Sequence, residues 1–332
     1  MIIVLKTLFV FCVIIFSLFH CSVIYFLLYE RRRKNQVYSS SFYTFYVINA
    51  LVGQFYVIDI AWMWISAIIP DLRNFVDTDD WIIVDQMVLL AAGFLQFCLI
   101  STYTVMTVNR YKVLQRIDRL GAPWTTKMTV MLVIVSFVVP LALIIHRSLY
   151  GFDIDVGDFL IYYTYNVYPG NFIIQLLNII YDSINLIICF YLSLKSAKLY
   201  KKLHFHSNNS PQNNRVEKHD DKLFMQSIFA ICCLLIRLQT DCLRIVVQMT
   251  QAKAMFEVIQ IVNTLLATIH SLGGSVFLLI ISQVVRRGYA NFYHLATRHK
   301  TNSVKILEHP TKKCRSISAP EILDIKKLVY VT

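Results

Sequence analysis

Three charged residues stand close together in a long apolar stretch, and their spacing could support an internal ion pair. Arg237, Asp241 and Arg244 follow one another at i, i+4 and i+7. This spacing puts all three on one face of a helix, where Asp241 can bridge both guanidinium groups. A charge at the centre of a bilayer costs about 3 kcal/mol or more unless it is paired or hydrated. The spacing therefore predicts that these side chains face protein groups rather than lipid.

Two further carboxylates, Asp59 and Asp182, lie in other apolar stretches and must also face the protein interior or water. Together with the three residues above, they are predicted either to clasp helices in register or to bind a ligand and switch. His270 lies near the middle of another apolar stretch. It could sense a ligand or protons, or it could make a hydrogen bond to a neighbouring helix.

Nothing in the chain predicts an enzyme. The HExxH, GxSxG, P-loop and Gly-rich dinucleotide patterns are all absent from the sequence. His204, His206 and His219 lie in a polar segment whose composition is typical of a linker. No pair among the eight cysteines has zinc-type spacing. We therefore expect no catalytic residue, no metal site and no cofactor.

The elements that must position these residues are membrane helices. Hydrophobic residues make up 57% of the chain and charged residues only 16%, so the apolar excess must face lipid. Backbone in lipid satisfies its own hydrogen bonds, which favours helices long enough to cross a core of roughly 30 Å. The expected helices cover residues 8–29, 42–68, 83–108, 128–145, 172–194, 223–247 and 256–281. The sequence predicts an all-α integral membrane protein, with a seven-transmembrane helix bundle over residues 1–285 and a flexible basic tail over residues 286–332.

The distribution of basic residues sets the expected orientation. The loops and tail on one side of the membrane hold 26 of the 32 Lys and Arg residues, and the opposite side holds four, including Arg147. By the positive-inside rule, the N-terminus is predicted to lie outside and the C-terminus in the cytosol. The net charge of +12 then indicates contact with membrane lipid rather than with nucleic acid. Residues 286–299 are predicted to form an amphipathic helix with Tyr289, Phe292 and Leu295 toward lipid.

The triplet Asn109-Arg110-Tyr111 falls at the expected cytosolic end of the third helix. A basic residue between an amide and an aromatic residue at this place could reach between helices and meet a cytosolic partner. The triplet alone is a weak signal, and its position at the inner end of the third of seven helices makes it stronger.

With these features the chain resembles the seven-transmembrane G-protein-coupled receptors and, more narrowly, the nematode serpentine chemosensory receptors of the gamma class. The resemblance rests on Asn109-Arg110-Tyr111, on Ser41-Phe42-Tyr43 opening the second helix, on Trp124, and on the outer-loop run Tyr162-Tyr163-Thr164-Tyr165. It implies a chemosensory receptor for a small-molecule cue that signals to a heterotrimeric G protein, with Arg110 gating access. It also implies the plasma membrane of a sensory cell or its cilium.

The chain departs from the rhodopsin-type pattern in three places. No cysteine stands near Asp85 at the start of the third helix, helix 223–247 contains no proline, and the last helix reads His270-Ser271-Leu272-Gly273-Gly274 in place of NPxxY. Rhodopsin-type switching is therefore not expected to transfer directly.

The outer halves of the third, fifth, sixth and seventh helices would line a ligand pocket. The candidate residues are Met87, Phe94, Gln175, Gln248, Glu257 and Gln260. Two alternatives from other classes stay open at this stage. One is a ligand-gated cation channel of the odorant-receptor type, and the other is a proton-linked transporter built around Asp59, Asp182 and Asp241.

Overall fold

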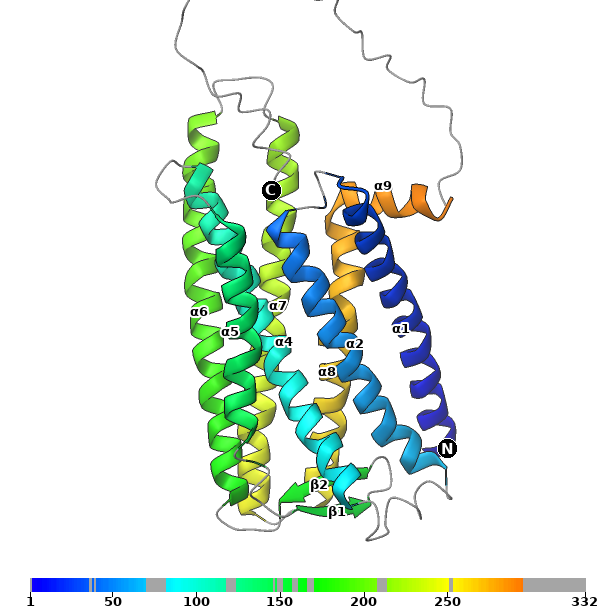
Figure 1. The fold of residues 1–332 in the computed structure, drawn as a ribbon. Helices are drawn as coiled ribbons and strands as arrows, with labels where there is room; N and C mark the ends of the chain where they lie inside the picture. Colours follow the sequence, from blue (N-terminus) through cyan, green and yellow to red (C-terminus); the bar gives the residue numbers. More distant parts are fainter. Residues whose placement is uncertain are drawn as a thin grey trace, which may run out of the picture.

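The computed structural model describes residues 2–35, 38, 40–69, 82–117, 124–145, 147, 152–156, 161–165, 170–207, 214–250 and 253–294. Within these ranges, long helices run side by side as a bundle, and one short helix lies across its end (Figure 1). The long helices are α1 (Ile2–Arg32), α2 (Ser41–Ile68), α4 (Ile82–Ile117), α5 (Thr126–Ile145), α6 (Gly170–Ser207), α7 (Asn214–Met249) and α8 (Lys253–Ile281). The short helix is α9 (Gln283–Phe292).

Each of the expected helix ranges lies inside one of these long helices, but several helices extend well beyond the apolar segment. Helix α4 runs on from residue 108 to Ile117, and α6 runs on from residue 194 to Ser207. The added turns are rich in Lys, Arg, Leu and Gln, which favour helix in water as well as in lipid. Hydropathy therefore locates the segment that lipid can cover, but it does not locate the residue at which the helix ends.

Six of the described helices are long and apolar enough to cross a membrane, namely α1, α2, α4, α5, α6 and α8. Helix α7 is not among them, although it lies in the same bundle (Figure 1). It carries Arg237, Asp241 and Arg244 within its apolar part, and these charges lower its hydropathy.

Two short strands interrupt the helical pattern, which an all-α expectation did not foresee. Strands β1 (Phe152–Val156) and β2 (Ile161–Tyr165) pair antiparallel, with Phe152 opposite Tyr165 and Val156 opposite Ile161. Strand β2 consists of β-branched and aromatic residues, which favour extended backbone, and β1 alternates such residues with Asp153 and Asp155. The hairpin lies across one end of the bundle, beside α2 and α6 (Figure 1). We call this the hairpin end, and the opposite one the α9 end.

Helix α4 is central to the packing, because it contacts α2, α5, α6 and α7. Its residues Cys98, Leu99 and Ile100 are completely buried. By contrast, α1 and α5 expose rows of large apolar side chains such as Leu8, Phe11, Ile134 and Val138. Exposed apolar rows of this kind suit contact with lipid tails.

Helix α9 packs on protein rather than on lipid, which corrects the orientation expected for its aromatic face. It begins at Gln283 and the side chain of Ser282 caps it by accepting from the backbone N–H of Val285. Tyr289 donates to or accepts from Ser22 Oγ at 2.7 Å, and the Phe292 ring packs edge-on against Phe26 of α1. Leu295 lies outside the described residues. The aromatic residues therefore dock α9 onto α1 instead of turning toward the membrane.

Candidate functional site

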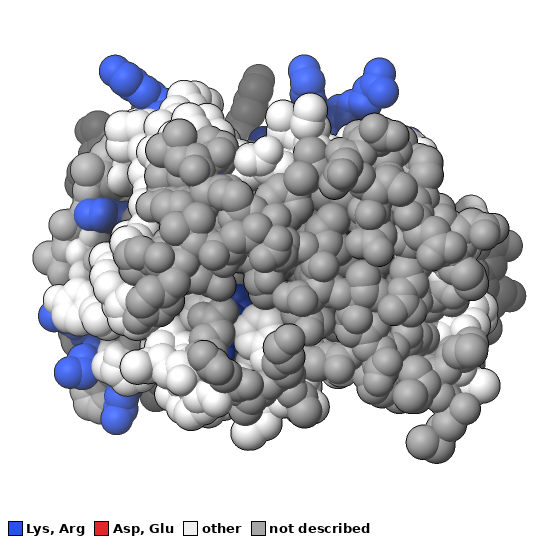
Figure 2. All heavy atoms as spheres, turned by 90° about the horizontal axis from the view of Figure 1, so that it is seen from below, with Lys and Arg blue, Asp and Glu red and all other residues white. Residues whose placement is uncertain are grey.

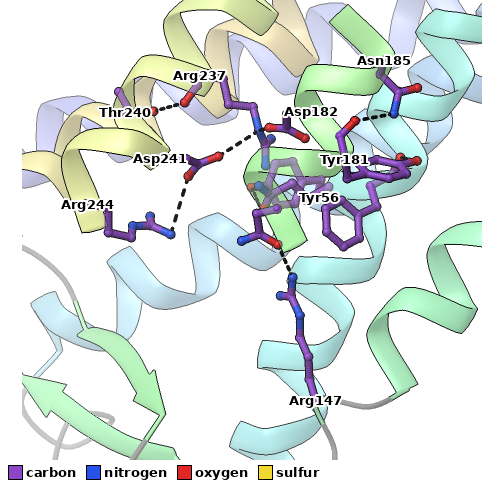
Figure 3. Close-up of polar contacts among 12 residues, drawn as sticks. Tyr56, Arg147, Tyr181, Asp182, Asn185, Arg237, Thr240, Asp241 and Arg244 are labelled. Carbon is purple, nitrogen blue, oxygen red and sulfur yellow. Dashed lines mark hydrogen bonds and ion pairs between the residues drawn. The ribbon is translucent and has the colours of Figure 1, made fainter. Parts of the chain in front are cut away.

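Four charged residues from two helices meet inside the bundle (Figure 3). Arg237 Nε of α7 donates to Asp182 Oδ2 of α6 at 2.7 Å. Asp241 lies between the two arginines, with one carboxylate oxygen 3.9 Å from Arg237 Nε and the other 3.9 Å from Arg244 Nη1. We call these four residues the ionic cluster. The sequence predicted that Asp241 could bridge both guanidinium groups, and it lies within ion-pair range of each.

The closest ion pair in the cluster is the interhelical one. Asp182 is fully buried and Arg237 nearly so, and Gln96 of α4 lies against the same guanidinium. A buried ion pair requires close geometry and further hydrogen bonds to offset the loss of water. The contact between Arg237 and Asp182 therefore ties α6 to α7, and Gln96 adds a neighbour from α4.

Asp59 does not join the ionic cluster through any direct pair among the described residues. It is half-buried on α2, and its Oδ2 has no hydrogen-bond partner in the described part of the chain. The five carboxylate and guanidinium residues grouped by the sequence thus divide into a cluster of four and one separate aspartate.

The six candidate pocket residues have different surroundings. Gln175 is buried on α6, and among the described residues its Oε1 has no hydrogen-bond partner. Phe94 packs near Phe137, with ring centroids 6.3 Å apart. Gln260 of α8 accepts a hydrogen bond from Arg244 Nη2 at 2.7 Å. Met87 is 63% exposed and so stands apart from this interior. The side chains of Gln248 and Glu257 lie outside the described residues.

Arg147 lies inside the bundle, whereas the charge count placed it in an outer loop. Its side chain is buried, donates to Asn178 Oδ1 of α6 and lies over the Phe97 ring at 5.2 Å from the centroid. Gly93 of α4 leaves room for it, because a Cβ at that position would lie 2.7 Å from Arg147 Nη1. Cation–π contact and an amide acceptor can hold a cation in such a place. The place of Arg147 in the sequence, just after an apolar helix, did not predict this burial.

At the α9 end, the triplet Asn109-Arg110-Tyr111 contacts two other helices. Asn109 is 0% exposed and accepts a hydrogen bond from Ser41 Oγ of α2 at 3.0 Å. Arg110 Nη1 donates to Ser227 Oγ of α7 at 3.1 Å. Tyr111 Oη accepts from Gln115 Nε2 within α4 at 2.8 Å. The triplet therefore links the same end of α2, α4 and α7.

Two histidines lie at the middle of the bundle, of which the sequence singled out only His270. The His270 ring stacks on Tyr103 with centroids 4.6 Å apart. His20 of α1 contacts the Ala50 carbonyl of α2 at 2.9 Å and Ser275 Oγ of α8 at 2.7 Å. Tyr46 of α2 reaches the same Ser275 Oγ at 3.0 Å. His20 thus joins three helices, a role that its isolated position in an apolar stretch did not reveal.

This bundle of long helices has the fold of a known receptor. The fold is similar to that of squid rhodopsin, with a TM-score of 0.64 and 12% sequence identity over 87% of this chain and 85% of that one. The family model described as "Serpentine type 7TM GPCR chemoreceptor Srv" matches residues 8–291. The chain therefore belongs to the Srv family of serpentine chemoreceptors. A search of curated proteins found no match.

Family membership confirms the expectation of a membrane-embedded chemosensory G-protein-coupled receptor. It also confirms the serpentine class in general, but the matching model is that of the Srv family and not of the gamma class. The narrower assignment to the gamma class rests on short motifs alone. The family is one of receptors, so neither the channel nor the transporter alternative is retained.

Proposed function

We propose that the chain spans the membrane seven times, with the hairpin end outside and the α9 end in the cytosol. Helix α7 supplies the seventh span, since its charged residues lie in the ionic cluster and away from lipid. The strong bias of Lys and Arg toward the α9 end supports this orientation. An antibody tag at the N-terminus should stain unpermeabilised cells, and staining only after permeabilisation would contradict the orientation.

In this orientation, a small-molecule cue binds from the outside among α4, α6, α7 and α8, at the plasma membrane of a sensory cell or its cilium. The gamma-class assignment stays a prediction from the motifs. The ionic cluster and Gln260 provide the polar groups that such a site needs to orient a ligand. Gln175 adds a buried acceptor from α6.

The inner end of α4 then couples the receptor to a heterotrimeric G protein. The observation that carries this proposal is the hydrogen bond from Arg110 to Ser227, which joins α4 to α7 at the cytosolic end. In a bundle with two states, such a contact can hold the cytosolic ends of the helices together in the inactive state. The contact is then broken in the active state. In the active arrangement the guanidinium of Arg110 turns from Ser227 toward a G protein, and Asn109 stays anchored to α2 through Ser41.

Replacing Arg110 by Gln tests this role. The Arg110→Gln receptor should reach the cell surface in normal amounts but lose cue-dependent signalling. Lys112→Gln is the matched control, because it removes one positive charge from an exposed position on the same turn. Signalling that survives Arg110→Gln, or that falls equally in Lys112→Gln, would remove Arg110 from the coupling site.

A further inference from the structure

The two arginines of the ionic cluster differ in how fully their donors are used. Arg237 donates to Asp182 at 2.7 Å, lies beside Gln96 and has Asp241 within 3.9 Å. Arg244 makes one hydrogen bond among the described residues, to the neutral amide of Gln260, and its Nε has no partner there. A guanidinium carries five donors in a planar fork. Arg244 is therefore the cation of the cluster whose hydrogen-bonding capacity is least filled.

Arg244 also has the most exposed side chain of the ionic cluster. Its side chain is 16% exposed, whereas Asp241 is 3% and Asp182 0% exposed. It lies in the part of α7 that leads to Met249 at the hairpin end. Figure 2 looks onto this end and shows Lys or Arg atoms recessed in the middle of the face, among uncharged atoms and residues that are not described.

The arrangement of charges within the ionic cluster favours an anionic partner over a cationic one. Among the described residues, Asp241 is the carboxylate that forms an ion pair with Arg244, and it already lies 3.9 Å from both arginines. A cationic ligand that approached Asp241 would meet two guanidinium groups at the same time. An anion would instead fill the free donors of Arg244 in a region where water is scarce, and there such pairs are strongest.

We infer that Arg244 and Gln260 form the anchor for the carboxylate of a small organic acid, which makes acids the ligand class of this receptor. The fork of Arg244 can donate two parallel hydrogen bonds to one carboxylate. Gln260 uses its oxygen to accept from Arg244, so its amide nitrogen is left to donate to the same ligand. This inference rests on the ligand site proposed above and does not depend on G-protein coupling.

Binding to the purified full-length chain tests the inference without any G protein. The probes are benzoate, hexanoate and succinate, each compared with its uncharged amide by the rise in unfolding temperature in detergent. At least one carboxylate should stabilise the chain with a saturable dependence on concentration, and its amide should not. If no carboxylate does so, or if the amides act equally, Arg244 is not an acid anchor.

Two substitutions change affinity in opposite directions. Gln260→Glu is isosteric and supplies an internal carboxylate to Arg244, so it should weaken carboxylate binding by about 10-fold or more. Asp241→Asn removes the carboxylate that competes for Arg244 and should tighten binding several-fold, which misfolding cannot imitate. Gln283→Glu, at an exposed position of α9, is the matched control and should leave affinity unchanged.

The outcomes separate this inference from the proposed coupling function. Equal carboxylate affinity in Gln260→Glu and the wild type, or no gain in Asp241→Asn, would overturn the acid anchor even if signalling proceeds normally. Conversely, a receptor that binds carboxylates through Arg244 but activates no G protein would leave the anchor in place and would contradict the coupling proposal.

Discussion

Arg237 of α7 and Asp182 of α6 form a buried ion pair at 2.7 Å, in which both side chains are almost completely removed from solvent. Neither partner has a second ion pair of comparable length among the described residues. The pair joins α6 and α7, two helices that follow each other in the chain. It is therefore the strongest candidate for a contact that fixes how α6 and α7 lie against each other.

Removing one member of this pair should be far more harmful than removing both. Asp182→Asn leaves Arg237 buried without its closest counter-charge, and we expect a loss of about 3–5 kcal/mol in the free energy of unfolding. Arg237→Met alone should cost a similar amount, because Asp182 is then left uncompensated. The double variant Asp182→Leu/Arg237→Met should recover much of the loss. Thermal unfolding in detergent measures all three, and additive losses would show that the two residues act independently.

Gly288 should be intolerant of a larger side chain. A Cβ at this position would lie 2.9 Å from Phe26 Cζ and would also crowd the Tyr38 hydroxyl, so α9 can approach α1 closely only with glycine there. Gly288→Val is expected to cost about 1–3 kcal/mol by overpacking and to raise hydrogen exchange along α9. Asn291→Ala, at an exposed position of α9, serves as the control. Unchanged exchange in Gly288→Val would mean that α9 does not depend on this contact.

Ser275 should matter more than the serine one turn before it. Its hydroxyl contacts both His20 Nδ1 and Tyr46 Oη, and Ser275→Ala would leave two buried polar groups without this partner. We expect a loss of about 1–3 kcal/mol in the free energy of unfolding. The Ser271 hydroxyl is buried and has no hydrogen-bond partner in the described part of the chain, so Ser271→Ala should be nearly neutral. Equal losses in the two variants would contradict the role given to Ser275.

The sequence predicted the helices better than it predicted their contacts. Hydropathy located each long helix of the described residues, because covering a segment with lipid is a local property. The alignment of Arg237, Asp241 and Arg244 on one face was also local, and the structure places them near one another. Which carboxylate from another helix would meet Arg237 depends on how helices pack, and no residue spacing encodes that choice. Asp59 and Asp182 were equal candidates, and among the described residues only Asp182 pairs with Arg237.

Three residues whose surroundings were predicted wrongly show the same limit. Arg147 follows an apolar helix and so reads as a loop residue, but a gap at Gly93 and an acceptor on Asn178 bring it inside. Tyr289 and Phe292 form the apolar face of an amphipathic helix, and such a face can pack on lipid or on protein. Here the face packs on protein, because Phe292 contacts the ring of Phe26 and Tyr289 contacts the hydroxyl of Ser22, both on α1. Both outcomes depend on neighbours that are distant in the sequence.

The most direct test of the account is nucleotide exchange on a heterotrimeric G protein by the purified chain in lipid nanodiscs, without any cue. The contact between Arg110 and Ser227 is proposed to keep the cytosolic end closed. Ser227→Ala should therefore raise the basal exchange rate several-fold, and Arg110→Gln should reduce it to that of empty nanodiscs. A basal rate that neither substitution changes would contradict coupling through the inner end of α4.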